Sequence, residues 1–332
     1  MKTALVLACD DNFVPYACTV ARRAAHLSSE RFPIVILSDG VSEENKRHAQ
    51  RLCSRIAFIE ASNLFAGKEF RTAAAITRST YLRLYLDEVL ADFTRVVYLD
   101  GDMTPLVDLA PLLHMVPRAA PVMAAYSLDH KPERTYASLP LLRDAGYLQA
   151  GLQIYDLKAV REERILKDAI KFALEHPETC GLGDQDAINV VLQGRWQVLD
   201  WRWNVMNKDA RFLPSPFYIR HHGGPSKPWS ADKSECEPHI VRKWREDLEA
   251  GPWAAAFVAD RRRSFVRKYL RPITRAVEVP VKAALRGDFD TVLRGEREQR
   301  QMRRYMEQVP SMLKKIEEAA REGRLAKALD RL

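Results

Sequence analysis

Two carboxylates separated by one glycine, Asp100-Gly101-Asp102, follow the apolar run Arg95–Leu99. One interpretation is turn chemistry, since Asp and Gly are common where a buried strand ends. The other is a metal site, because both carboxylates can reach one cation if Gly101 lets the chain turn beneath it. Hard carboxylate oxygens suit Mg²⁺ or Mn²⁺, which usually complete their shell with substrate phosphates. The motif alone leaves both interpretations open.

The stretch "HHGGPSKPW", from His221 to Trp229, combines residues that favour an anion. His221 offers an imidazole ligand, and the adjacent glycines Gly223 and Gly224 would let backbone N–H groups approach a phosphate closely. Lys227 supplies a compact positive charge. The alternative is structural, with His221 as a hydrogen-bonded histidine at a strand end and Trp229 as a core anchor.

A third polar group, "CDDNF", ends the first apolar run of the chain. A nucleotide base could stack on Phe13 while Asp10 or Asn12 hydrogen-bonds its edge. The alternative is a helix start, with Asp11 or Asn12 as the N-cap and Phe13 packing against the helix.

Short β-branched runs alternate with helical patterns through the first half of the chain. This alternation predicts an α/β fold with a mostly parallel sheet covered on both faces. Sheets of this kind bind ligands beyond the carboxyl ends of their strands, where the Asp10 and Asp100 groups both lie. The expected strands are Thr3–Cys9, Pro33–Leu37, Ile56–Ile59, Arg95–Leu99 and Pro121–Ala125, and the expected helices are Pro15–Leu27, Glu43–Cys53 and Thr77–Leu90.

The second half continues the pattern and then changes in character. We expect a strand at Gln149–Leu157, helices at Arg161–Leu174 and Gln185–Gln193, short strands at Trp196–Asp200 and Phe217–Arg220, and a Gly/Pro/Ser-rich loop over 223–238. Beyond Arg261 the chain becomes strongly basic with helical spacing of its apolar residues. The sequence therefore predicts a globular domain over residues 1–259 and a basic helical extension over 260–332.

Several classes of protein are disfavoured by what the sequence lacks. There is no G-x-G-x-x-G, no P-loop motif and no G-x-S-x-G, which argues against dinucleotide-dependent oxidoreductases, P-loop enzymes and serine hydrolases. The five cysteines show no paired spacing, so they indicate a reducing cytoplasm. Cys236 and His239 resemble half a zinc site without a second half. We read no signal peptide and no membrane span.

The positive charge is concentrated in the C-terminal extension. Residues 260–332 hold 20 Lys and Arg against 11 Asp and Glu, whereas the whole chain has a net charge of +8. A nearly neutral body argues against nucleic acid as a partner. The extension is suited to peripheral contact with an anionic membrane on its cytoplasmic face, or alternatively forms a charged helix packed on the body or on a neighbouring subunit.

Six segments in order resemble one family, the retaining nucleotide-sugar glycosyltransferases of family eight, and especially the bacterial lipopolysaccharide galactosyl- and glucosyltransferases. They are "ACDDNF", "TRSTYLRLYL", "YLDGDM", "LQAGLQIYDL", "GDQDAIN" and "HHGGPSKPW", and the resemblance runs from about Lys2 to Trp229. It implies the GT-A type of fold, a nucleotide-sugar-binding α/β sheet. It also implies transfer of galactose or glucose from a UDP-sugar to an oligosaccharide or glycolipid acceptor, in lipopolysaccharide or other surface-glycan synthesis.

The resemblance also implies roles for individual residues. Mn²⁺ (or Mg²⁺) would be bound by Asp100, Asp102 and His221. The catalytic centre would hold Gln185 and Asp184, with Gln185 close to the anomeric carbon. The nucleotide-sugar would contact Ala8, Cys9, Asp10, Asn12, Phe13, Arg83, Asp100, Gly101, Asp102, Asp129, Gln149, Ala150, Gly151, Gly224 and Lys227. Two positions depart from the family: Phe13 replaces a tyrosine, and Gln149 replaces an asparagine, which bears on the preferred hexose.

The mechanism of transfer and the function itself each leave alternatives open. Retention of configuration can come from a nucleophile on the protein or from front-face attack assisted by the leaving phosphate. Gln185 is a poor nucleophile because a neutral amide cannot match a carboxylate, so we favour front-face attack with Gln185 as a positioning group. The rival functions are a sugar nucleotidyltransferase, which would normally carry a Gly-rich loop near its N-terminus, and a non-catalytic UDP-sugar-binding protein.

Overall fold

The computed structural model describes residues 2–257 except 74, 75, 119, 128–138, 140, 141, 143, 144, 211 and 231–234. The predictions made for Asp129 and for the basic extension 260–332 lie outside the described residues. The division of the chain near residue 259 therefore stays a prediction.

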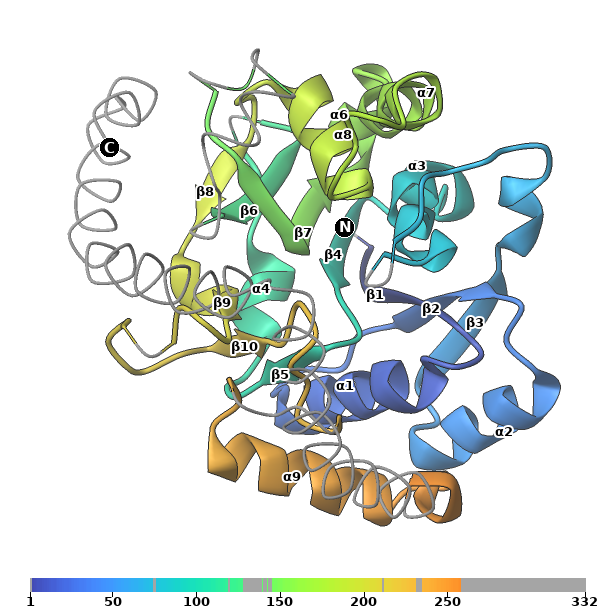
Figure 1. Ribbon diagram of the computed structural model, residues 1–332, viewed down its shortest axis with the longest axis vertical. Coiled ribbons are helices and arrows are strands. Elements are labelled where there is room, and N and C mark those ends of the chain that lie inside the picture. Colours follow the sequence, from blue (N-terminus) through green and yellow to red (C-terminus); the bar gives the residue numbers. More distant parts are fainter. Residues whose placement is uncertain are drawn as a thin grey trace, which may run out of the picture.

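A seven-stranded sheet forms the centre of the molecule (Figure 1). Its order is β3-β2-β1-β4-β7-β6-β8, and within it only β7 runs antiparallel to its neighbours. The prediction of a mostly parallel sheet is therefore confirmed. The strands are β1 (Thr3–Asp10), β2 (Ile34–Asp39), β3 (Ile56–Glu60), β4 (Arg95–Leu99), β6 (Val122–Tyr126), β7 (Leu148–Asp156) and β8 (Gln197–Leu199).

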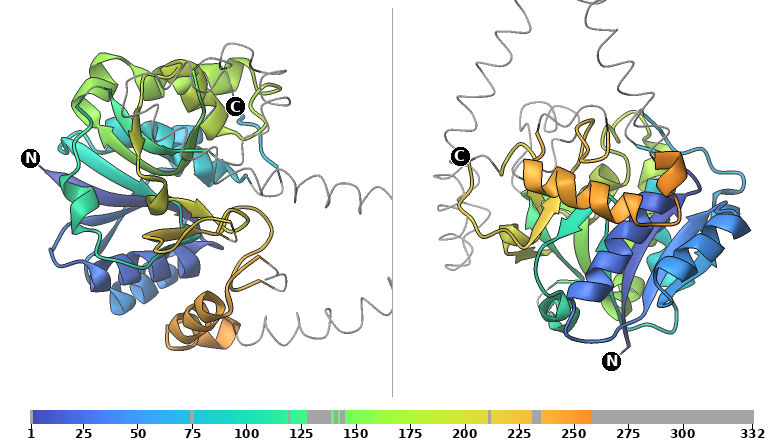
Figure 2. Two further views of the ribbon diagram at one scale, coloured as in Figure 1. Left: turned by 90° about the vertical axis from the view of Figure 1, so that its left-hand side faces the viewer. Right: turned by 90° about the horizontal axis from the view of Figure 1, so that it is seen from below.

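Helices cover both faces of this sheet, as Figures 1 and 2 show. Alternate residues of β1 point to opposite faces, so Leu5 and Leu7 pack with α1 whereas Ala4 and Val6 pack toward α7 and α8. One face carries α1 (Val14–Leu27), α2 (Glu43–Leu52) and α9 (Pro238–Glu249). The other carries the 3-10 helix Arg78–Tyr85, α3 (Leu86–Val89), α6 (Leu157–Glu162), α7 (Ile165–Glu175) and α8 (Asp184–Leu192).

A second, three-stranded sheet lies beside the end of β4. Its order is β5 (Met103–Pro105), β10 (Ile219–His221) and β9 (Val205–Met206). The chain passes from β4 through Asp100-Gly101-Asp102 directly into β5, and β5 pairs with β10 so that Met103 faces His221. This pairing brings the histidine of the predicted phosphate loop next to the two carboxylates, although more than 100 residues separate them in the sequence. The remaining short elements are α4 (Ala110–His114) and the 3-10 helices Ser62–Phe65 and Trp201–Trp203.

Two predicted helices were wrong in detail. Residues 78–85 form a 3-10 helix in which all but Arg78 and Thr80 are buried, so the segment has no exposed face of the kind a surface α-helix needs. The predicted helix Arg161–Leu174 is two helices, because Arg164 adopts a left-handed conformation with φ 56° between α6 and α7.

Helix α9, the last helix described, was not predicted from the sequence. Its buried residues Ile240, Trp244 and Leu248 recur every four positions, which is a helical signal. Figure 2 shows α9 beside α1, and Arg23 of α1 pairs with Asp247 of α9. Across the described ranges, every helix is too short or too polar to cross a membrane.

Candidate functional site

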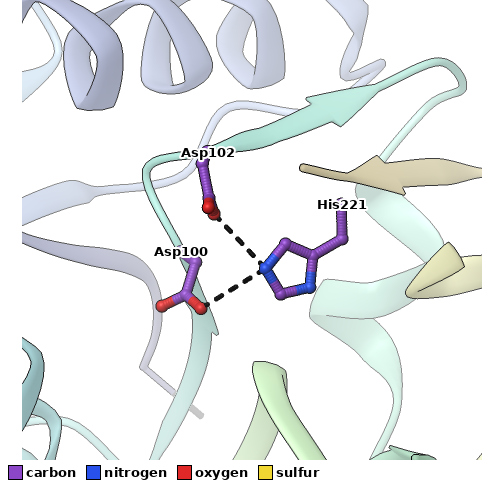
Figure 3. A group of neighbouring side chains, drawn as sticks. All are labelled: Asp100, Asp102 and His221. Carbon is purple, nitrogen blue, oxygen red and sulfur yellow. Dashed lines mark ion pairs between the residues drawn. The ribbon is translucent and has the colours of Figure 1, made fainter. Parts of the chain in front are cut away.

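Asp100, Asp102 and His221 converge on one point at the carboxyl end of β4 (Figure 3). The Nε2 atom of His221 lies 3.7 Å from Asp100 Oδ2 and 3.3 Å from Asp102 Oδ1. One ligand atom from each residue lies within 4.8 Å of the other two. The three groups therefore stand where a single cation would contact all of them.

The state of these side chains fits a divalent metal. Asp102 Oδ1 is buried and accepts no hydrogen bond from the described residues, which is costly unless another group binds it. Two carboxylate oxygens and one imidazole nitrogen suit Mn²⁺, because imidazole is a better ligand for transition metals than for Mg²⁺. The structure brings all three predicted metal ligands together, and it favours the metal interpretation of Asp100-Gly101-Asp102 over a simple turn.

Gly151 makes the approach of His221 possible. A Cβ atom at this position of β7 would lie 2.3 Å from His221 Cε1 and 2.6 Å from His221 Nδ1. The Gly151 carbonyl also accepts a 2.8 Å hydrogen bond from the Asp100 N–H. Gly151 therefore lies against one candidate ligand and is bonded to the backbone of another.

We expect Gly151→Ala to displace the His221 imidazole and weaken Mn²⁺ binding at least 10-fold. Gly181→Ala is a matched control, because the nearest atom to its Cβ would be Asp186 Oδ2 at an ordinary 3.9 Å. Mn²⁺ affinity measured by electron paramagnetic resonance tests this. Equal affinity in the two variants would contradict the assignment of His221 as a ligand.

Lys227 contacts the Asp102 carboxylate through the oxygen that does not face His221. Its ammonium group donates to Asp102 Oδ2 and to the His222 carbonyl. Burial alone would raise the pKa of Asp102, but the Lys227 ammonium group holds that pKa well below its usual range. Gly224 has a φ of +81°, a left-handed conformation that glycine adopts without strain, and the chain turns there three residues before Lys227. Trp229 stacks on Tyr16 at 4.3 Å, so it is the core anchor of the alternative interpretation.

Arg83 is fully buried between two acids. Its Nη2 donates to Asp100 Oδ1 at 2.6 Å, its Nε lies 2.8 Å from Asp184 Oδ2, and its Nη1 donates to the Ala150 carbonyl. Despite the guanidinium, burial raises the pKa of Asp100 above its usual value. Arg83 thus links the candidate metal site to the N-terminus of α8.

Asp184 makes the stability of the folded protein depend on pH. Burial raises its pKa to about 7 even though Arg83 opposes the shift. Between the ordinary Asp pKa of ~4 and about 7, the unfolded chain has lost this proton and the folded chain keeps it. The stabilising contribution is therefore present at low pH and is lost as pH rises to about 7.

The Asp184→Asn variant should lack this contribution. Its free energy of unfolding relative to the wild type should rise by a few kcal/mol between about pH 5 and about pH 8, with a slope of at most ~1.4 kcal/mol for each unit of pH. Urea unfolding with a chelator present measures both proteins. Parallel pH profiles for the two proteins would contradict the raised pKa.

Gln185 is held at both ends of its amide. Its Oε1 accepts a 2.9 Å hydrogen bond from the Ala150 N–H, and its Nε2 donates to the Tyr147 hydroxyl at 3.3 Å. Tyr147 in turn donates to Asp186, whose other oxygen accepts from the Leu182 N–H. The structure therefore places Gln185 against the predicted Gln149-Ala150-Gly151 segment and assigns Asp186 to supporting the start of α8.

The residues predicted to contact a nucleotide lie at the carboxyl end of β1. Asp10 Oδ1 accepts a 2.9 Å hydrogen bond from the Phe13 N–H, while Asn12 is exposed. Phe13 borders the carboxylates, since a Cβ on Gly101 would lie 2.9 Å from its ring. Ala8 is half-buried and Cys9 is buried with a raised pKa, so Cys9 contributes packing.

The alternative reading of this segment as a helix cap was wrong. The N-cap residue of α1 is Phe13, and no side chain caps it. Asp11 instead accepts hydrogen bonds from the Ser42 N–H and the Asn45 side chain, and so tethers the start of α2. The spacing in the sequence places Asp11 beside the start of α1, and it does not show that the side chain bonds to the start of α2.

Several polar residues that hydrogen-bond the adjacent histidines His221 and His222 were not predicted. Asn204 Oδ1 lies 2.9 Å from His221 Nδ1, and Thr104 Oγ1 and Asn207 Oδ1 hold the two nitrogens of His222, each at 2.7 Å. Burial lowers the pKa of His222, and both nitrogens of its ring are taken up by Thr104 and Asn207. Cys236 lies 3.9 Å from His222, and among the described residues only Asp100, Asp102 and His221 form a metal-type cluster. No pattern in the sequence marks Asn204, because only the pairing of β9 with β10 brings it next to His221.

Comparison with known proteins decides the family. The model of a family described as glycosyl transferase family 8 matches residues 4–233, more than two-thirds of the chain. The chain belongs to glycosyl transferase family 8. The resemblance carried by the six sequence segments is therefore confirmed, and Asp100, Asp102, His221 and Lys227 all lie within the matched residues.

Relatives of this family 8 glycosyltransferase include a putative glycosyltransferase of Haemophilus influenzae, 22% identical over 250 residues, which span 71% of this chain and 76% of the relative. Another is a lipopolysaccharide 1,2-glucosyltransferase of Escherichia coli, 25% identical over 191 residues, which span 53% of this chain and 56% of the relative. Among solved structures, the galactosyltransferase LgtC with donor and acceptor sugar analogues has a TM-score of 0.68 at 24% identity, covering 75% of this chain and 96% of that chain. The likeness confirms the predicted GT-A type of fold.

Proposed function

We propose that this family 8 glycosyltransferase moves galactose or glucose from a UDP-sugar to an oligosaccharide or glycolipid acceptor, with a divalent metal and with retention of configuration. The observation that carries the proposal is the cluster of Asp100, Asp102 and His221, with Lys227 bonded to the second carboxylate. A cation and an ammonium group side by side form a receptor for a diphosphate.

The reaction makes a diphosphate receptor useful. Breaking a sugar–phosphate bond leaves an oxocarbenium-like carbon and a departing diphosphate, so the barrier depends on how well the new negative charge is stabilised. Bound Mn²⁺ would act as a Lewis acid on that leaving group. Lys227 and the N–H groups around Gly224 would bind the same oxygens. Phe13 and the exposed Asn12 stand at the adjacent strand end, where the nucleoside would lie.

Retention by front-face attack is favoured by the hydrogen bonds of Gln185. Its carbonyl oxygen already accepts from the Ala150 N–H, and its NH₂ group donates to Tyr147. An amide oxygen held in this way is a positioning and stabilising group rather than a nucleophile. Asp184 is paired with Arg83, and its raised pKa keeps it protonated over a wider pH range, which also makes it a weaker nucleophile.

The acceptor and the setting rest on the relatives. The lipopolysaccharide glucosyltransferase and the LgtC galactosyltransferase both transfer hexoses, as their names state. We infer a surface glycan or its lipid-linked precursor as the acceptor, with the enzyme working at the cytoplasmic side. Attachment of the 260–332 extension to an anionic membrane remains a prediction, since that segment lies outside the described residues.

Incubation with labelled UDP-galactose and UDP-glucose tests the reaction type. With Mn²⁺ and no acceptor, we expect slow release of UDP and hexose from one donor, and with acceptor we expect the α-anomeric product by NMR. Release or consumption of pyrophosphate, in place of UDP release, would instead support a sugar nucleotidyltransferase. Binding of UDP without hydrolysis or transfer to any glycan would support a non-catalytic binding protein.

A further inference from the structure

The candidate ligand His221 must present the lone pair of Nε2 to the metal, so its proton must be on Nδ1. Nothing in the three ligands themselves fixes this choice. A chain of hydrogen bonds behind the ring does so, and it starts from a backbone group whose direction is unambiguous.

The Gly151 N–H is a donor and lies 2.5 Å from one atom of the Gln149 side-chain amide. That atom must be the oxygen, because the NH₂ group accepts nothing. Asn204 contacts the same Gln149 oxygen at 2.6 Å, so the Asn204 atom facing it must be the NH₂ group. The remaining Asn204 atom, its oxygen, therefore faces His221.

This Asn204 oxygen lies 2.9 Å from His221 Nδ1, and an amide oxygen can only accept. Nδ1 must then carry the proton. A competing contact is longer: Gln149 Nε2 lies 3.3 Å from the same Nδ1 and also 3.6 Å from Met206 Sδ, which can accept its hydrogen. Both Asn204 and His221 are buried, at 7% and 3% exposure, so water does not replace these bonds easily.

We propose that Gln149 and Asn204 are positioning residues that set the tautomer and ring orientation of His221 for metal binding. Gln149, which the resemblance predicts to contact the donor sugar, has its amide turned toward His221 and Asn204. The inference rests on the proposed metal-dependent function. It assigns to this chain a relay from the Gly151 backbone to a metal ligand.

The closest comparison within the molecule is the neighbouring pair of Asn207 and His222. Asn207 Oδ1 also lies 2.7 Å from a histidine Nδ1, and both residues are buried. The Nε2 of His222, however, is bonded to Thr104 rather than aimed at the carboxylates. Asn207→Leu is thus a matched control that removes the same group from the same kind of pair, outside the ligand set.

The test compares Asn204→Leu, Asn204→Asp and Asn207→Leu. We expect Asn204→Leu to weaken Mn²⁺ binding by 10- to 100-fold in electron paramagnetic resonance titrations. Asn204→Asp keeps an oxygen opposite Nδ1 and should recover most of that affinity. The Mn²⁺ affinity of Asn207→Leu should stay within about 2-fold of the wild type, even if its melting temperature falls as far as that of Asn204→Leu. Equal weakening in both leucine variants, or no weakening in either, would overturn the proposal.

A second measurement needs neither metal nor activity. Nitrogen-15 NMR of histidine-labelled protein, with His221→Gln for assignment, should show the Nδ1–H tautomer of His221 in the wild type and a shift toward the other tautomer in Asn204→Leu. An unchanged tautomer would overturn the proposal. If the wild type bound no Mn²⁺ while the tautomer still depended on Asn204, the proposed metal-dependent function would fail and the relay would stand.

Discussion

Replacing Asp102 with asparagine is expected to lower transfer by about 10³-fold, equivalent to ~4 kcal/mol of lost transition-state stabilisation. The change keeps the size of the side chain and removes its charge. Asp102 is the carboxylate that meets both His221 and Lys227, and its buried Oδ1 accepts no hydrogen bond from the described residues. Initial rates with saturating donor and Mn²⁺ measure the effect.

Asp156→Asn is the matched control for this change. Asp156 ends β7 and caps α6 by accepting hydrogen bonds from Lys158 and Ala159, and asparagine caps helices equally well. We expect its activity and stability to equal those of the wild type. Full activity of a folded Asp102→Asn variant would refute the role of this carboxylate in transfer.

Replacing Arg83 with methionine is expected to lower the free energy of unfolding by about 3 to 5 kcal/mol. Methionine fills a similar volume but leaves the buried Asp184 and the partly exposed Asp100 without their cation. The two carboxylates then repel each other. Urea unfolding in the presence of a chelator measures the loss separately from any effect on metal binding.

Two further variants separate charge pairing from packing. Arg78→Met removes an arginine that pairs with Asp39 but has half of its side chain exposed, so we expect a loss of ~1 kcal/mol or less. Adding Asp184→Asn to Arg83→Met removes one unpaired acid and should restore part of the lost stability. A single Arg83→Met variant as stable as Arg78→Met would be incompatible with this account.

The sequence predicted the main sheet well because its strands carry a local signal. Runs such as Arg95–Leu99 are short, apolar and rich in β-branched residues, and each ends in polar residues at the edge where the site forms. The alternation of strands and helices then limits the topology. The antiparallel insertion of β7 was not predicted, since its apolar pattern resembles that of its parallel neighbours.

The supporting contacts of the site could not be predicted in the same way. Asn204 acts through an amide orientation fixed by Gln149 and Gly151, which are more than 50 residues away. Asp11 and Asp10 differ by one position, yet one tethers α2 and the other meets the Phe13 N–H. Such assignments depend on which distant backbone group lies within reach, and a one-dimensional pattern does not contain that information.

Calorimetric titration of UDP-galactose and UDP-glucose, each with and without Mn²⁺, tests the central claim most directly. We expect one donor to bind tightly with Mn²⁺ and at least 10-fold more weakly with a chelator, and we expect Asp102→Asn to remove this difference. Binding that is equally strong with and without metal would contradict it, and Asp100-Gly101-Asp102 would then be a turn after a buried strand.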